Sequence, residues 1–123
     1  EYLENKGYTI NDYGCFSEES VDYPDFAHQL AESIQKENSD LGIQFCGTGN
    51  GINMSANKHS QIRAALCWNP HIAEQARLHN NANVLTMPAR HLQWNEVKEI
   101  IDVFLSSEFE GGRHQRRVNK ISI

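Results

Sequence analysis

A cysteine and a threonine stand in a glycine-rich run, Cys46-Gly-Thr-Gly-Asn-Gly51, between an apolar stretch and a helical one. Glycine adopts positive φ without steric cost, so three glycines here predict a sharp turn that something can approach closely. The helix that follows offers unpaired N–H groups and about half a positive charge at its start. We therefore expect the turn to hold an anion beside the Cys46 thiol and the Thr48 hydroxyl, which suggests chemistry as well as binding.

The same residues are also compatible with an ordinary strand-to-helix turn in which Cys46 is a small buried side chain, as free cysteines usually are. A dinucleotide site is disfavoured. Ile52 stands where the G-x-G-x-x-G fingerprint requires glycine, and the expected second strand, Arg63–Cys67, has no acidic residue at its end.

Two further groups of polar residues could serve a phosphorylated ligand. Arg113 and Arg117 follow Gly111-Gly112 and are four residues apart, so on a helix they share one face and can converge on a phosphate. The alternative is a solvated basic helix end. His79 and Asn80 end another predicted helix, where they either cap its last carbonyls or reach an active-site edge.

Composition limits the classes of function. With 123 residues, the chain is expected to form a single domain, 1–123. Its formal charge of −5 argues against a broad surface for nucleic acid or anionic membrane, and no apolar run approaches the ~18 residues of a spanning helix. Three cysteines without CxxC spacing fit the reduced thiols of a cytoplasmic protein. The histidines show no HxH or HExxH pairing, so we expect no metal.

Strands are predicted at 8–13, 41–46, 61–67 and 82–87, and they alternate with helices. The helices begin near Asp22-Tyr23-Pro24, after Asn50, at Asn69-Pro70 and after Gln93 or Asn95, and a basic helix lies within 109–123. The helix after Gln93 has one apolar face, which comprises Trp94, Val97, Ile100, Ile101, Phe104 and Leu105. Alternating strands and helices predict a parallel sheet covered on both faces. Ligands gather at the carboxyl ends of such strands, so we expect the Cys46 turn and the His79 region to share that edge.

Six segments together carry a family resemblance that covers nearly the whole chain. They are Asp22–Pro24, Cys46–Gly51, Ala56–Lys58, Ile62–Ala65, Ala76–Leu85 and Glu110–Val118. On these segments the chain resembles the type B ribose-5-phosphate isomerases, a family that includes allose-6-phosphate and galactose-6-phosphate isomerases. The resemblance implies a Rossmann-like three-layer α/β/α fold with five parallel strands. It also implies a homodimer, or a dimer of dimers, with active sites shared between chains.

The activity implied by the resemblance is a cofactor-free aldose–ketose isomerisation of ribose 5-phosphate and ribulose 5-phosphate, through an enediolate, in the pentose phosphate pathway. Cys46 matches the thiol that moves the proton between C1 and C2. The enediolate cradle matches Thr48 and the backbone N–H groups of Gly47, Gly49, Asn50 and Gly51. His79 matches the residue that opens the furanose ring, with Asn80 close by, and Arg113 and Arg117 match the phosphate clamp.

The family's first strand, which ends in an Asp-His pair, has no counterpart after Glu1, so we expect that strand to precede the printed residues. Three alternatives remain open from the sequence. The substrate could be a six-carbon sugar phosphate, the chain could bind phosphosugars without turning them over, or it could be a purely structural oligomeric domain.

Overall fold

The computed structural model describes residues 1–14 and 22–123, and its centre is a three-stranded parallel sheet in the order β1-β3-β2. The strands are β1 (Gly42–Cys46), β2 (Ala64–Leu66) and β3 (Val84–Pro88). The helices are α1 (Tyr2–Asn5), α2 (Tyr23–Gln35), α3 (Asn50–Ala56), α4 (Pro70–Asn80), the 3₁₀ turn η1 (Ala89–His91), α5 (Trp94–Ser106) and α6 (Arg113–Asn119). Cys15 lies outside the described residues.

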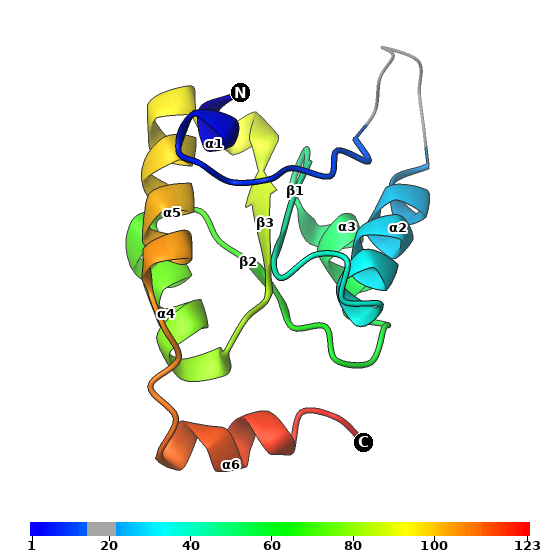
Figure 1. Ribbon diagram of the computed structural model, residues 1–123, viewed down its shortest axis with the longest axis vertical. Coiled ribbons are helices and arrows are strands. Elements are labelled where there is room, and N and C mark those ends of the chain that lie inside the picture. Colours follow the sequence, from blue (N-terminus) through cyan, green and yellow to red (C-terminus); the bar gives the residue numbers. More distant parts are fainter. Residues whose placement is uncertain (15–21) are drawn as a thin grey trace.

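Helices cover both faces of the sheet, as the sequence predicts. In Figure 1, α4 and α5 lie on one side of β3, and α2 and α3 lie on the other. Each side has its own apolar core: Phe104, Ile100 and Leu85 belong to the α4/α5 side, and Ala27, Ile52 and Val84 to the α2/α3 side. All five residues of β3 are buried, as befits the central strand of a sheet covered on both faces. None of the described helices is long and apolar enough to span a bilayer.

The helix starts follow local sequence signals. The Asn69 side chain accepts a hydrogen bond from the N–H of Ile72, and Pro70 occupies the first turn of α4. Gln93 and Glu96 form a reciprocal capping box at the start of α5. The predicted apolar face of α5 is correct except for Trp94, which is 56% exposed and packs its ring edge-on against Tyr2.

The predicted strand at 8–13 is wrong, because this segment has no regular secondary structure. A strand needs a hydrogen-bonded neighbour, and among the described residues this segment pairs with no strand. It is held instead through side chains: Asn11 Nδ2 donates to the carbonyl oxygen of Asn38 at 3.1 Å, and the Tyr13 hydroxyl donates to Ser33 Oγ at 3.0 Å.

A buried polar chain fixes α3 on the sheet. Gln44 Nε2 donates to Thr86 Oγ1 at 2.8 Å, and Thr86 Oγ1 donates to Asn53 Oδ1 at 2.7 Å. The hydroxyl of Thr86 therefore joins β1, β3 and α3. A buried polar group that loses its partner costs about 1–3 kcal/mol, so this side chain contributes to the position of the turn that precedes α3.

We expect Thr86→Val to lower the free energy of unfolding by about 1–3 kcal/mol, because at similar side-chain volume it removes the donor to Asn53 Oδ1 and leaves Gln44 Nε2 with only its 3.3 Å bond to the carbonyl oxygen of Ile52. Denaturant unfolding measures the change. Thr86→Ser is the matched control, since it keeps the hydroxyl and loses only a methyl group. Equal destabilisation by the two substitutions would show that packing, and not the hydroxyl, matters here.

Candidate active site

The glycine turn predicted from the sequence lies at the carboxyl end of β1, directly before α3. Gly49 has φ +83°, and a Cβ at this position would lie 2.5 Å from Leu66 Cδ1. Any other residue would therefore be strained in its backbone and would also clash with β2. The turn depends on glycine here for both reasons.

The side chains of Cys46 and Thr48 both border this turn. Cys46 is half-buried, forms no disulfide with the other cysteine among residues 1–14 and 22–123, and packs against the apolar core on the α2/α3 side. Thr48 is exposed, and its Oγ1 accepts a long 3.4 Å hydrogen bond from the N–H of Asn50. The thiol is thus neither sealed in the core nor fully solvated, and a hydroxyl lies in the same bend.

Two side chains that the sequence analysis did not assign to the site cover the turn. A Cβ at Gly51 would lie 2.5 Å from the Tyr23 hydroxyl, and a Cβ at Gly47 would lie 2.9 Å from the guanidinium carbon of Arg90. The N–H of Arg90 also donates to the carbonyl oxygen of Gly47 at 3.1 Å. A phenol and a guanidinium therefore border the thiol-bearing turn. Arg90 follows the end of β3 by two residues. Its position just beyond the carboxyl end of a predicted strand could have identified it as a candidate site residue.

The other described cysteine is chemically different. Cys67 is completely buried, its Sγ lies 3.6 Å from the carbonyl oxygen of Ala65, and burial raises its pKa to about 12. Because thiolates and not thiols are the reactive species, Cys67 is inert at neutral pH.

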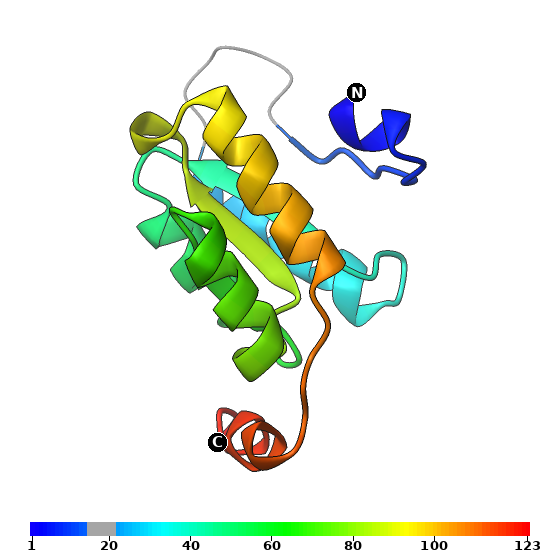
Figure 2. The same cartoon turned by 90° about the vertical axis from the view of Figure 1, so that its left-hand side faces the viewer.

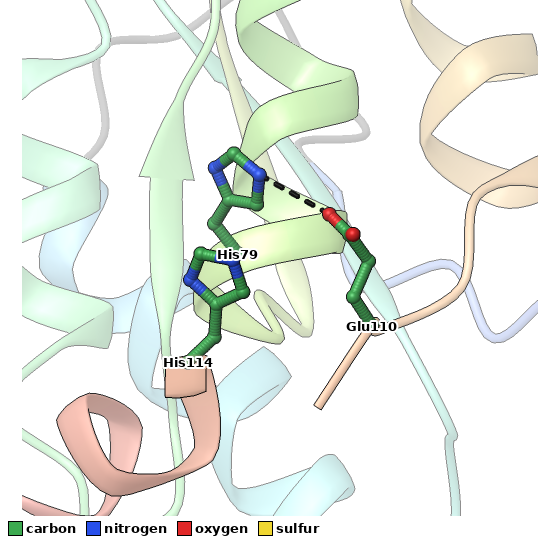
Figure 3. Close-up of side chains that lie close together, drawn as sticks. All are labelled: His79, Glu110 and His114. Carbon is green, nitrogen blue, oxygen red and sulfur yellow. Dashed lines mark ion pairs between the residues drawn. The ribbon is translucent and has the colours of Figure 1, made fainter. Parts of the chain in front are cut away.

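A second group of polar side chains gathers around the end of α4 (Figure 3). His79 Nε2 lies 3.2 Å from Glu110 Oε1, and the His79 ring stacks on that of His114, with centroids 4.2 Å apart and planes at 14°. Partial desolvation, followed by the positive charge that His79 and Arg113 can carry, lowers the pKa of His114. The potential metal-ligand atoms of His79, Glu110 and His114 all lie within 4.8 Å of one another. Sequence spacing could not show this cluster, because His79 is far from Glu110 and His114 in the chain.

The expectation that the Cys46 turn and His79 share one edge of the sheet is wrong for a single chain. Asn83, just after α4, accepts a hydrogen bond from the N–H of Gly42 and donates to the carbonyl oxygen of Arg63, and these residues precede or begin β1 and β2. The end of α4 therefore lies at the amino edge of the sheet. The carboxyl edge is roughly 16 Å away for a five-residue strand at about 3.3 Å per residue. Figures 1 and 2 agree that α6 lies beyond the amino edge, remote from the Cys46 turn.

Arg113 and Arg117 lie on α6, as predicted, and both are exposed. Their spacing of four residues puts them on one face of this helix. Asn80, in the last turn of α4, is also exposed. The two arginines are therefore on the same side of the molecule as His79 and opposite to the glycine turn.

Comparison with known proteins shows where this arrangement belongs. Residues 1–121 match the family model described as Ribose/Galactose Isomerase. Ribose-5-phosphate isomerase B of Escherichia coli is 41% identical over 121 residues, which cover 98% of this chain and 81% of that protein. A crystal structure of a ribose 5-phosphate isomerase from Thermotoga maritima has a TM-score of 0.95 and is 50% identical, with 98% of this chain and 83% of that chain covered.

The ribose-5-phosphate isomerase B of Mycoplasma genitalium, whose structure contains bound ribulose-5-phosphate, has a TM-score of 0.94 and is 44% identical, with 98% of this chain and 80% of that chain covered. These matches extend over both the glycine turn and the His79 region. The family resemblance stated on the sequence motifs is therefore confirmed, and the chain belongs to the ribose/galactose isomerase family.

Proposed function

We propose that this protein interconverts ribose 5-phosphate and ribulose 5-phosphate without a cofactor. The observation that carries the proposal is the half-buried Cys46 thiol at the carboxyl end of β1, beside a turn that needs glycine at position 49. Relatives named ribose-5-phosphate isomerase B, one of them with ribulose-5-phosphate bound, support this substrate.

Cys46 is the group that moves the proton. Its thiolate removes the proton from C2 of the open-chain aldose, the C2–H electron pair forms the enediolate double bond, and charge develops on the sugar oxygen at C1. The same sulfur then returns the proton to C1, while the hydroxyl proton at O2 is transferred to the oxygen at C1. Each proton removed is thus returned, and no external oxidant or reductant is needed.

The enediolate is stabilised by donors that are already in place. We assign this role to Thr48 Oγ1 and the N–H groups of Gly47, Gly49, Asn50 and Gly51, and the guanidinium of Arg90 lies next to Gly47. Preorganised donors of this kind are worth roughly 10²- to 10³-fold in rate each. Arg90 adds positive charge at the point where negative charge develops.

His79 opens the furanose ring, with Glu110 orienting its imidazole and Asn80 beside it. The 3.2 Å contact between His79 Nε2 and Glu110 Oε1 fixes one ring nitrogen, so the other is directed away from the carboxylate. Arg113 and Arg117 bind the substrate phosphate from the same side of the molecule. Guanidinium groups suit phosphate oxygens because they donate in pairs.

A complete site requires two copies of the chain. Cys46 and His79 lie at opposite edges of one sheet, whereas a sugar phosphate must contact both at once. A homodimer in which the His79 edge of one chain meets the Cys46 turn of its partner satisfies this requirement, and two-fold symmetry then makes two identical sites. A dimer of dimers would contain the same pair.

We expect Cys46→Ala to reduce kcat for ketose formation by about 10²- to 10⁴-fold, the usual contribution of a positioned acid–base group. Cys67→Ala is the matched control, since it removes the other described thiol, and its folded fraction should keep normal turnover. Near-normal turnover by Cys46→Ala would exclude Cys46 as the base.

Substrate preference is a separate test. Comparable kcat/KM values of the wild-type protein for ribose 5-phosphate and for allose or galactose 6-phosphate would argue against a five-carbon preference.

Mixing two inactive variants tests the shared site. Cys46→Ala and His79→Ala homodimers should each be nearly inactive. After subunit exchange, half of the dimers are mixed, and each of these contains one site with both residues intact. We therefore expect recovery of about a quarter of normal activity for a random mixture. No recovery after exchange has been verified by mass spectrometry would place both residues in the site of one chain.

For the phosphate clamp, we expect Arg113→Ala and Arg117→Ala each to raise KM about 10- to 100-fold, because a charged hydrogen bond contributes about 1.5–3 kcal/mol. Gln115→Ala, two residues from each arginine and on the opposite face of the same helix, serves as the control. Steady-state kinetics with ribose 5-phosphate measures all three, and an unchanged KM in the first two would exclude the clamp.

A further inference from the structure

The cluster at the end of α4 combines two imidazoles and a carboxylate. His79 comes from the last turn of α4, Glu110 from the segment before α6, and His114 from the first turn of α6. Figure 3 shows the carboxylate of Glu110 directed at His79 and the ring of His114 beneath that of His79. All three offer a potential ligand atom within 4.8 Å of the others.

The backbone holds these three residues together independently of any ligand. The N–H of Glu110 donates to the carbonyl oxygen of Leu78 at 3.1 Å, which ties the segment before α6 to the end of α4. Gly111 and Gly112 have φ values of +70° and +55° and so turn the chain back toward α4. The N–H of His114 donates to the carbonyl oxygen of Gly111 at 3.1 Å, which begins the helix with His114 over His79.

The donor set and its dimensions suit a divalent transition metal of the zinc class. Zinc prefers imidazole nitrogen and carboxylate oxygen at about 2.0–2.2 Å, in a tetrahedron whose donors are about 3.4 Å apart. The 3.2 Å separation of His79 Nε2 and Glu110 Oε1 already meets this requirement. The stacked ring of His114 must rotate about its side-chain bonds to direct a nitrogen at the same point, and this residue lies near the surface on a short helix.

We propose that His79, Glu110 and His114 form a binding site for Zn²⁺ or a similar divalent metal ion, with a fourth position open to water. The nearby guanidinium groups of Arg113 and Arg117 oppose the ion's charge, and the single carboxylate offsets only part of it, so the site is one for reversible binding. It departs from the expectation of no metal, which considered only spacing along the sequence.

Metal binding would also inhibit turnover, and this second step rests on the proposed function. An ion coordinated by His79 Nε2 occupies one nitrogen of the ring-opening residue and fixes the imidazole in a new orientation. The ion also places positive charge beside Arg113 and Arg117, the two arginines of the phosphate clamp. The metal thus competes with the sugar phosphate for the same edge of the molecule.

Binding is tested by calorimetric titration of Zn²⁺ into the full chain carrying Cys46→Ser, which removes a thiol that could also bind zinc. We expect one ion per chain, with affinity reduced at least tenfold by Glu110→Gln and by His114→Ala, since loss of even an outer-shell partner typically costs 10- to 100-fold. His71→Ala, an exposed histidine near the start of α4, is the matched control and should bind normally.

His114→Gln repeats the test if His114→Ala does not fold, as judged by circular dichroism. Titration with Co²⁺ identifies the donors. We expect the visible bands of nitrogen and oxygen ligation without a near-ultraviolet sulfur-to-metal charge-transfer band. Unchanged zinc affinity in the His114 variants, or a sulfur charge-transfer band, would overturn the proposal.

Inhibition is measured separately on the wild-type protein, with each variant compared with its own metal-free rate. We expect Zn²⁺ to inhibit ribose 5-phosphate turnover and a chelator to restore it. The Zn²⁺ concentration that halves the rate should be at least tenfold higher in the His114 variants. Binding without inhibition would overturn the inhibitory step and leave the site intact. Absence of turnover in metal-free wild-type protein would instead contradict the proposed function, while the calorimetric result would still decide the metal site.

Discussion

A helix that joins two parallel strands must run back across the sheet, so it ends at the edge where the strands begin. In this chain the rule separates the two side chains that we propose act on the sugar. Cys46 ends a strand and His79 ends such a helix, so the same connectivity that makes the sheet parallel holds them a strand's length apart. Under the proposed mechanism these two groups act on one sugar, so the separation is the reason for proposing that two chains associate to complete each site.

The carboxyl edge is organised by close approach around glycine. Gly47, Gly49 and Gly51 each face a different neighbour, respectively the Arg90 guanidinium, Leu66 of β2 and the Tyr23 phenol. A side chain at any of them would displace one wall of the turn. The repeated glycines therefore reflect three separate contacts as well as backbone flexibility.

Local signals in the sequence were sufficient for most of the framework. Apolar periodicity and caps such as Asn69 and Gln93 predict helices whose starts the structure confirms, because these signals depend on neighbours a few residues away. The predicted strand at 8–13 was wrong because strand formation depends on a neighbouring strand, and this segment pairs with none among the described residues. The prediction that Trp94 faces the core was wrong, because a periodic pattern cannot distinguish a core position from one that packs on a surface tyrosine.

The site was predicted less completely, for a related reason. The glycine turn is contiguous in sequence and was recognised. The arrangement of Glu110 and His114 around His79 depends instead on how the start of α6, and the segment before it, pack against the end of α4.

The length of α6 bears on how the two arginines are positioned. This helix has only seven residues and none of them is buried, and a helix so short is not stable by itself in water. Its order must come from its contacts with the end of α4, chiefly the stack of His114 on His79 and the hydrogen bond from Glu110 to Leu78. The same contacts therefore hold Arg113 and Arg117 at the His79 edge. A metal ion, a partner chain or a change in protonation that rearranges His114 should therefore also move the guanidinium groups, and in the proposed mechanism this couples phosphate binding to ring opening through one pair of imidazoles.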